Sequence, residues 1–229
     1  MSGESGAAGV IFAILPVKSP QNAKQRLEGY LPPAYRAALA RLMYEQTIAS
    51  LCQTRGIDRI VVASNDTQIA GHARALGALV IEESAQLSHS ASADAACLRA
   101  MELGATAALL VPIDVPLAVP EDFERLAAAA RSGGQPSLVI VPSADGTGTN
   151  ALGRTPPDVI ASRFGPGSFS IHLNLAAERG VSAEVLRLPG LMFDIDTPED
   201  VTELLARAPQ SRVAAFLRSS GQLRSCTWK

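Results

Sequence analysis

The clearest indication of the fold of this chain is Val10–Val17, with the sequence VIFAILPV. It is apolar along its whole length instead of at alternate positions, which indicates a strand covered on both faces of a sheet. Further short apolar runs follow it along the chain. These additional predicted strands are Arg59–Ala63, Ala78–Ile81, Ala107–Ile113 and Ser137–Val141.

Segments whose apolar residues recur at helical spacing separate these strands, and Gly77 and Gly104 close two of them. The predicted helices are Arg36–Gln53, Thr67–Leu76, Ser90–Leu103 and Glu121–Ala130. Short strands that alternate with helices predict βαβ units with parallel strands. The expected fold class is therefore α/β, a single Rossmann-like domain with a mostly parallel sheet and helices on both faces.

The pattern changes after Pro142, where glycine-rich loops replace the regular alternation. In chain order we expect a loop Asp145–Asn150 (DGTGTN), a loop Arg163–Ser168 (RFGPGS), a helix to Arg179, a strand over Glu184–Leu188 and a helix from Pro198. The predicted domain spans residues 10–207, with residues 1–9 as a flexible N-terminal tail and residues 208–229 as a C-terminal tail.

The composition excludes several classes of protein. The 229 residues carry a net charge of −2, and 47% of them are hydrophobic. This apolar content excludes an intrinsically disordered chain, and the length fits one large domain at ~150 residues per domain. Without a basic excess the chain cannot displace the counterions of a nucleic acid, so we expect no nucleic-acid partner.

The cysteines Cys52, Cys97 and Cys226 are odd in number and widely spaced. This pattern predicts neither a zinc site nor a disulfide framework, and it favours a reducing compartment. The first ten residues lack the basic start and apolar core of a signal peptide. Because no apolar stretch is long enough to span a bilayer, we expect a cytoplasmic protein without a membrane partner.

Polar residues follow the predicted strands at their carboxyl ends, where open parallel sheets bind ligands. Lys18 follows the first strand, Asp114 follows the fourth, and the DGTGTN loop follows the fifth. Asp114 alone is equally consistent with a surface turn or a helix cap. A second acidic element, Asp194-Ile195-Asp196, favours a functional role, because alternate residues of an extended segment point to one side.

Asp114, Asp194 and Asp196 are therefore candidate ligands of Mg²⁺, which prefers oxygen ligands and usually takes one or two carboxylates with phosphate oxygens. Local structure explains the neighbouring residues, since Thr197 is a good N-cap and Asp200 completes a capping box. No such local role accounts for Asp194.

Two loops can bind an anion. The RFGPGS loop opens a helix with free backbone N–H groups, although Ser168 also suits a simple helix cap. The DGTGTN loop forms either a phosphate cradle or a flexible connection. Lys18 and Lys24, close to Arg26, either neutralise a polyphosphate or form an ordinary solvated loop. Together these features describe phosphoryl or nucleotidyl transfer, where the protein mainly positions groups and stabilises charge.

The remaining motif searches narrow the chemistry. Neither the phosphate-binding P-loop nor the dinucleotide G-x-G-x-x-G pattern occurs. No G-x-S-x-G nucleophile motif is present, so covalent catalysis has no candidate. Of the three histidines, His72 is expected on the surface of a helix, and His172 lies one turn into the helix after Ser168, where it is a candidate to support an anion site.

The motifs occur in a recognisable order. They are Leu15–Lys18 (LPVK) with Ala23–Leu27 (AKQRL), Asp114–Leu117 (DVPL), Asp145–Asn150, Phe164–Ser168 (FGPGS) with His172, and Asp194–Asp200 (DIDTPED). Over about Val10 to Leu205 this order resembles the CofC/FbiD family of coenzyme F420 biosynthesis. These are 2-phospho-L-lactate or phosphoenolpyruvate guanylyltransferases of the nucleotidyltransferase A superfamily, with a fold like that of nucleotide-diphospho-sugar transferases.

The resemblance implies that GMP passes from GTP to the phosphate of phosphoenolpyruvate, 2-phospho-L-lactate or 3-phosphoglycerate, with release of pyrophosphate and with Mg²⁺ as cofactor. The attacking phosphate is already ionised at neutral pH, so no general base is required. By resemblance, Lys18 and Asp114 are the catalytic residues, and Asp114, Asp194 and Asp196 bind Mg²⁺.

The resemblance also assigns residues to each substrate. Nucleotide binding falls to Pro16, Val17, Lys18 and Lys24, and acceptor binding to Thr149, Gly165, Gly167 and Ser168. In the family, the helix before the fourth strand often begins with a Gly-Leu-Asn-like segment near the nucleotide. Here that stretch is Ser88–Asp94 (SHSASAD), in which Ser92 or Asp94 would replace the polar contact.

Two other functions remain open. A molybdopterin or sugar-phosphate nucleotidylyltransferase usually carries a glycine-rich loop with a basic residue where this chain has Pro16-Val17-Lys18. A non-catalytic nucleotide-binding regulator would not need all three carboxylates. The expected partners are GTP, the phosphorylated acid and a downstream F420-pathway transferase, with the chain as a monomer or homodimer.

Overall fold

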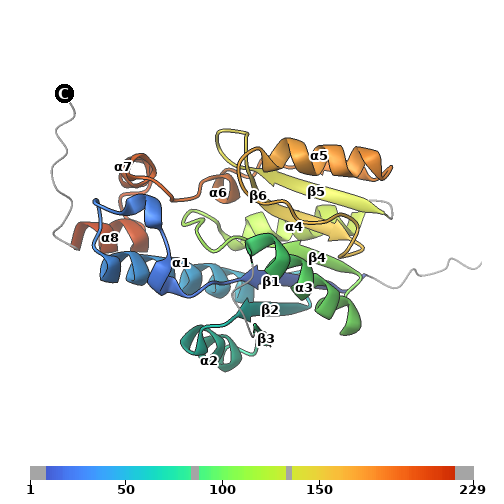
Figure 1. The fold of residues 1–229 in the computed structure, drawn as a ribbon, viewed down its shortest axis with the longest axis horizontal. Helices are drawn as coiled ribbons and strands as arrows, with labels where there is room; N and C mark the ends of the chain where they lie inside the picture. The colour runs from blue at the N-terminus through green and yellow to red at the C-terminus, as the bar shows by residue number, and fades with distance from the viewer. Residues whose placement is uncertain (1–8, 84–87, 133–135, 220–229) are drawn as a thin grey trace, which may run out of the picture.

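The computed structural model describes residues 9–83, 88–132 and 136–219 (Figure 1). A seven-stranded sheet runs through the molecule in the order β3-β2-β1-β4-β6-β5-β7. The strands are β1 Ile11–Pro16, β2 Arg59–Ser64, β3 Leu79–Glu82, β4 Ala107–Leu110, β5 Ser137–Pro142, β6 Thr149–Thr155 and β7 Ser182–Val185. The helices are η1 Pro20–Asn22, η2 Gln25–Leu27, α1 Pro33–Gln53, α2 Thr67–Ala75, α3 His89–Glu102, α4 Pro120–Ser132, α5 Ser168–Glu178, α6 Pro189–Met192, α7 Pro198–Arg207 and α8 Arg212–Ser219.

The sheet is mostly parallel, as the sequence predicts. Strand β1 pairs in parallel with both β2 and β4, and β7 pairs in parallel with β5. Strand β6 alone among the described strands runs antiparallel to its neighbours, β4 and β5. The reversal places the start of β6 beside the carboxyl ends of β4 and β5.

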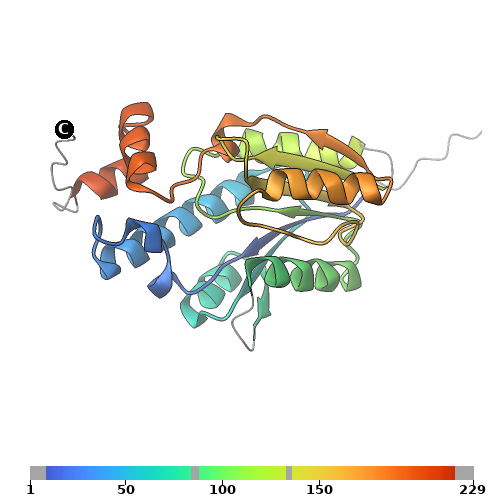
Figure 2. The same ribbon diagram turned by 45° about the horizontal axis from the view of Figure 1, so that its top comes forward.

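The two faces of the sheet are covered by different helices, which Figure 2 shows from the side. Ile11, Ala13 and Leu15 of β1 point into a core formed with α1, α2 and α4. Phe12 and Ile14 point into a second core formed with α3 and α5. All five side chains are fully buried, because helices cover both sides of a parallel sheet and leave no polar face. The expected α/β class is confirmed.

Strand β6 is missing from the sequence prediction, which places Thr149 and Asn150 in a loop. Polar and small residues hide this strand, since Gly153 and Arg154 interrupt any apolar run. A Cβ on Gly153 would lie 3.2 Å from side chains of both α4 and β5, so the close packing here requires glycine. The predicted strand Ala107–Ile113 also ends earlier, at Leu110, two residues before Pro112, which has no N–H to donate.

A third core lies beyond the sheet, where α7 and α8 pack against the first half of α1 (Figure 1). Val213, Ala214 and Leu217 of α8 are fully buried in it. The sequence suggests a tail from residue 208, but the structure places the helix α8 in this stretch and packs it against the domain. Residues 220–229 of the expected tail lie outside the described part of the chain. No described helix combines the length and apolarity needed to cross a membrane.

His172 of α5 connects the loops on the second face of the sheet. Its side chain is fully buried, its Nε2 accepts a hydrogen bond from the Arg163 amide at 2.9 Å, and its Nδ1 lies 2.9 Å from Thr149 Oγ1. Burial, helped by the charge of Arg154, lowers the pKa of His172 to about 4. A neutral ring that accepts at Nε2 carries its proton on Nδ1, so His172 donates to Thr149.

The buried face of α8 predicts that this helix contributes to the stability of the domain. We expect Leu217→Ala to lower the free energy of unfolding in urea by about 2–4 kcal/mol, because it leaves a cavity in the third core. Leu98→Ala is the matched control, since Leu98 is 54% exposed on α3. Equal, small losses for both variants would show that α8 does not pack as described.

The buried neutral His172 predicts a loss of stability in mild acid. Between pH 6.5 and pH 4 the unfolded chain binds a proton that the folded chain excludes, so stability falls as the pH drops. From pH 7 to pH 5 we expect this residue to account for about 2 kcal/mol of the loss. Urea unfolding at both pH values should show a smaller pH dependence for His172→Gln, and identical pH dependence would contradict the assignment.

Candidate active site

A cavity of about 930 Å³ opens at the end of the sheet where β1, β4 and β5 finish and β6 begins. It is lined by most of the residues that the sequence singles out. These lining residues are Pro16, Val17, Lys18, Lys24, Asp114, Thr149, Gly165, Ser168, Asp194 and Asp196. Five separate segments of the chain thus meet in one cavity, at the edge where an open α/β sheet binds ligands.

Three residues of the expected site do not line this cavity: Ser92, Asp94 and Gly167. Ser92 donates a hydrogen bond to Glu83. Asp94 accepts one from Arg154 at 2.8 Å and others from Ser162, so its carboxylate compensates the buried guanidinium of β6. This arrangement accounts for Asp94 as a structural ion pair, because a buried Arg needs a partner.

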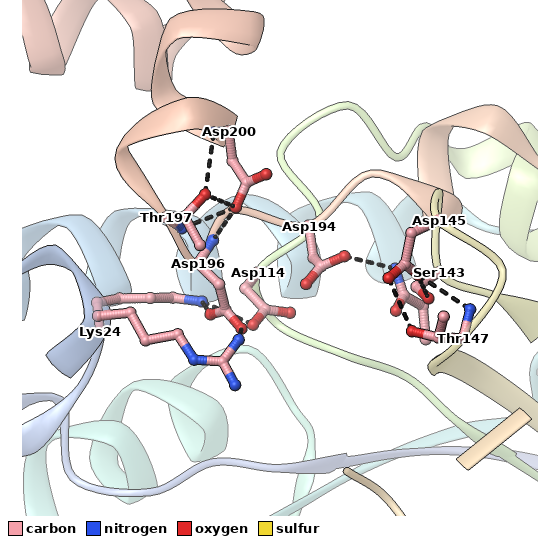
Figure 3. A network of polar contacts seen from close by, with 11 residues as sticks. Lys24, Asp114, Ser143, Asp145, Thr147, Asp194, Asp196, Thr197 and Asp200 are labelled. Carbon is pink, nitrogen blue, oxygen red and sulfur yellow. Dashed lines mark hydrogen bonds and ion pairs between the residues drawn. The ribbon is translucent and has the colours of Figure 1, made fainter. Parts of the chain in front are cut away.

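The acidic half of the site is organised around Lys24 (Figure 3). Its ammonium Nζ lies 2.7 Å from Asp114 Oδ2 and 2.9 Å from Asp196 Oδ1. The Lys24 side chain is only 8% exposed, whereas the carboxylates are 27% and 38% exposed. Arg26 approaches the other oxygen of Asp196 at 3.6 Å from a largely exposed position.

Lys24 and Asp114 shift each other's pKa values. Burial tends to lower the pKa of Lys24, but the two carboxylates outweigh it, so the pKa rises above its usual value. Burial likewise tends to raise the pKa of Asp114, but the charge and hydrogen bond of Lys24 outweigh it and lower the pKa. Lys24 and Asp114 are therefore charged together at neutral pH.

Asp194 lies beside this group, and no described lysine, arginine or histidine forms an ion pair with it. Its Oδ1 accepts a hydrogen bond from Asn150 Nδ2 at 3.1 Å. Burial, with the nearby charge of Asp114, raises the pKa of Asp194 to about 6. A carboxylate raised in this way is destabilised in its ionised form, so it gains from an added positive charge.

The chemistry of these oxygens fits a hard divalent cation. No three His, Cys, Asp or Glu side chains within the described ranges are grouped closely enough to hold a metal ion by themselves. Lys24 Nζ nevertheless lies where a cation contacts both Asp114 and Asp196, and Asp194 lies beside them without an ion pair to any described residue (Figure 3). Such a carboxylate set, completed by phosphate oxygens, is typical of Mg²⁺ sites.

Backbone contacts hold the acidic residues in place. The Ile195 amide donates to the Asp114 carbonyl at 3.1 Å, which joins the segment before α7 to the loop after β4. The Asp200 side chain accepts from the amides of Asp196 and Thr197, and Thr197 caps α7 in return. The predicted capping box is thus confirmed, and it anchors the residue next to Asp196 (Figure 3).

The cavity lining also carries two hydroxyl groups, those of Thr149 and Ser168. Ser168 Oγ accepts from the Thr149 amide at 2.8 Å, and Thr149 Oγ1 accepts from His172. Neither hydroxyl reaches an acceptor among the described residues, so each keeps its hydrogen for a ligand. Gly165 and Gly167 have φ angles of +126° and +72°, which allow the loop to turn into α5.

The DGTGTN loop is held by its own side chains. Asp145 accepts from the Ser143 hydroxyl, the Thr147 amide and the Thr147 hydroxyl, and these hydrogen bonds lower its pKa to about 2 (Figure 3). The Gly148 amide donates to Ser143 Oγ at 2.7 Å. The structure thus shows an ordered turn, which fixes the entry into β6 and hence the position of Thr149.

The further residues that line the cavity include His89, Asn150 and Phe164. The His89 and Phe164 rings contact edge-to-face, with centroids 5.0 Å apart. Burial, together with the Lys18 charge and against that of Asp114, lowers the pKa of His89. All three lie within stretches that the sequence already singles out, since Asn150 ends the DGTGTN loop, Phe164 belongs to the FGPGS motif and His89 lies in Ser88–Asp94.

Relatives with known names share most of this chain. It is 39% identical over 196 residues to phosphoenolpyruvate guanylyltransferase of Rubrobacter xylanophilus, covering 86% of this chain and 94% of that protein. It is 34% identical to 3-phospho-D-glycerate guanylyltransferase of Colwellia psychrerythraea, and the match covers 84% of this chain and 90% of that protein. It is 32% identical to 2-phospho-L-lactate guanylyltransferase of Methanothermobacter thermautotrophicus, and the match covers 90% of this chain and 89% of that protein.

Solved structures with lower identity share the fold. A protein of Desulfovibrio desulfuricans described as a nucleotide-diphospho-sugar transferase matches with a TM-score of 0.73 at 17% identity, over 93% of this chain and 96% of that one. A Mycobacterium tuberculosis protein in complex with manganese matches with a TM-score of 0.54 at 19% identity, and the match covers 87% of this chain and 99% of that one. The expected type of fold is confirmed.

The family model described as "Guanylyl transferase CofC like" matches residues 11–224, which includes every segment that lines the cavity. This agrees with the resemblance drawn from the ordered motifs and with the named relatives. The chain belongs to the CofC-like guanylyl transferase family.

Proposed function

We propose that this enzyme transfers GMP from GTP to the phosphate of a small phosphorylated acid, with Mg²⁺ bound by the carboxylates of the cavity. Pyrophosphate leaves, and the product is a guanosine diphosphate-linked acid. The observation that carries the proposal is the division of one cavity into a charged wall and a hydroxyl wall. Two substrates of different chemistry can therefore bind side by side.

The charged wall suits the triphosphate. Lys18 is exposed at the end of β1, and Lys24 lies buried beside Asp114 and Asp196. Bound Mg²⁺ would neutralise the phosphate charge that develops at the α-phosphorus and on the leaving pyrophosphate. Asp114 and Asp196, with Asp194 beside them, would hold this ion, and Lys18 would contact the phosphates.

The hydroxyl wall suits the acceptor. Thr149 and Ser168 each have a free hydroxyl hydrogen, and the backbone around Gly165 is open to a close approach. Donors of this kind bind a carboxylate or a phosphate without removing its charge. The acceptor phosphate is ionised at neutral pH, so it attacks as it is and the site needs no general base. His172 remains neutral and only orients Thr149.

The acceptor belongs to the class of three-carbon phosphorylated acids. The relatives are named for phosphoenolpyruvate, 3-phosphoglycerate and 2-phospholactate, which share a carboxylate and a phosphate on adjacent or nearby carbons. We propose that the product passes to a downstream transferase of coenzyme F420 biosynthesis in the cytoplasm. The deciding experiment incubates the purified protein with GTP, Mg²⁺ and each acid, and detects pyrophosphate and the linked product by mass.

The raised pKa of Asp194 predicts that its charge matters for turnover. We expect Asp194→Asn to lower kcat by about 100-fold or more, because a missing charge at a metal-assisted phosphoryl site weakens transition-state stabilisation. The exposed Asp158 offers the matched change, since Asp158→Asn should leave kcat unchanged. Full activity of Asp194→Asn in the pyrophosphate assay would remove Asp194 from the reaction.

The position of Ser168 predicts an effect on one substrate only. We expect Ser168→Ala to raise the KM for the acceptor acid by roughly tenfold, the equivalent of one lost hydrogen bond to a charged group. The KM for GTP should change little, and Ser170→Ala, at an exposed position of α5, should change neither. Equal rises in both KM values would refute the division of the cavity into two walls.

A further inference from the structure

Lys24 combines features that an ordinary phosphate-binding lysine does not need. It is the only non-glycine residue of the described chain with a positive φ, at 54°. A left-handed backbone is uncommon for such a residue and persists where the surroundings require it. Here the surroundings are the two carboxylates at 2.7 and 2.9 Å, which hold the ammonium away from solvent.

The choice of lysine at this position is informative. The chain contains three lysines, Lys18, Lys24 and Lys229, among 20 basic residues, so arginine is its usual cation. An ammonium is a compact point charge on a flexible stem, whereas a guanidinium is a broad, planar fork. Of the two, the ammonium more closely resembles a small metal ion between two carboxylates.

We propose that Lys24 is the resident cation of the carboxylate site, and that Mg²⁺ enters only by displacing it towards the triphosphate of the incoming nucleotide. This inference rests on the proposed function and names the role of one residue in it. Lys24 then has two positions, one on Asp114 and Asp196 and one on the phosphates. The cation site is occupied by the chain itself until nucleotide arrives.

Charge balance explains why the two ligands would bind together. A metal ion alone must expel the Lys24 ammonium from its ion pairs and leave it without an anionic partner, which opposes binding. A metal ion that arrives with a nucleotide supplies phosphate oxygens, and these take over the displaced ammonium. The affinities for metal and nucleotide are therefore coupled, and each raises the other.

The test measures metal binding without nucleotide and without turnover. Calorimetric titration with Mn²⁺ alone should show that Lys24→Gln binds the ion at least about tenfold more tightly than the wild-type protein, because no internal cation competes. Lys18→Gln is the matched control: Lys18 lines the same cavity but pairs with no described carboxylate, so its loss should leave the Mn²⁺ affinity unchanged. Equal affinities of Lys24→Gln and wild type would overturn the proposal.

A second measurement uses the wild-type protein and does not depend on how the variant folds. An amine-acylating reagent followed by mass spectrometry should label Lys24 slowly in metal-free protein, because its side chain is 8% exposed and paired. Raising Mn²⁺ into the millimolar range should speed this labelling, while Lys18, already exposed, serves as the internal reference. A rate of Lys24 labelling that does not change with the Mn²⁺ concentration would overturn the proposal.

The two proposals fail in different ways. A silent pyrophosphate assay with every acid tested would reject the proposed reaction but would leave the Mn²⁺ titration and the labelling results intact. Conversely, normal turnover with equal Mn²⁺ affinities for wild type and Lys24→Gln would keep the reaction and reject the resident-cation role of Lys24.

Discussion

The ion pairs of Lys24 with Asp114 and Asp196 are the interaction on which the arrangement of the site depends. They join residues that are 90 and 172 positions apart in the sequence. Carboxylates that close together repel one another unless a cation lies between them. The sheet brings the chain segments to one edge, and the buried ammonium lets the acidic groups remain there in their charged forms. Asp194 forms no ion pair with a described residue, and burial together with the charge of Asp114 raises its pKa.

The other wall of the cavity is built without charge. The buried, neutral His172 accepts a hydrogen bond from the Arg163 amide and donates one to the Thr149 hydroxyl, while the Ser168 hydroxyl accepts one from the Thr149 amide. Each hydroxyl therefore accepts within the protein and is left to donate outwards. The contrast with the acidic wall is one of polarity: one side offers charge to a cation and a polyphosphate, and the other offers neutral donors to a small anion. Family membership supports guanylyl transfer, and the two walls are the places that we propose for its two substrates.

Much of the site was predictable because it follows a general rule of open α/β sheets. Lys18 and Asp114 come directly after apolar strands, and such positions meet at the carboxyl edge. Local rules also identified the capping box of Thr197 and Asp200. Ser92 and Asp94 were assigned to the nucleotide only by family resemblance, and the structure instead pairs Asp94 with Arg154. Strand β6 escaped prediction for a related reason, since a buried arginine and a glycine replace its apolar pattern.

The class of fold, the ends of most strands and the motifs that line the cavity can be predicted from the sequence, because strand and helix patterns are local and repeat along the chain. Which charged side chains contact one another is known only from the three-dimensional structure. The choice of Lys24, instead of Lys18, as the partner of Asp114 and Asp196 depends on the path of a loop with a left-handed residue. The docking of α8 likewise depends on a core shared with α1 and α7. Such contacts join residues far apart in the chain, and no local pattern encodes their distance.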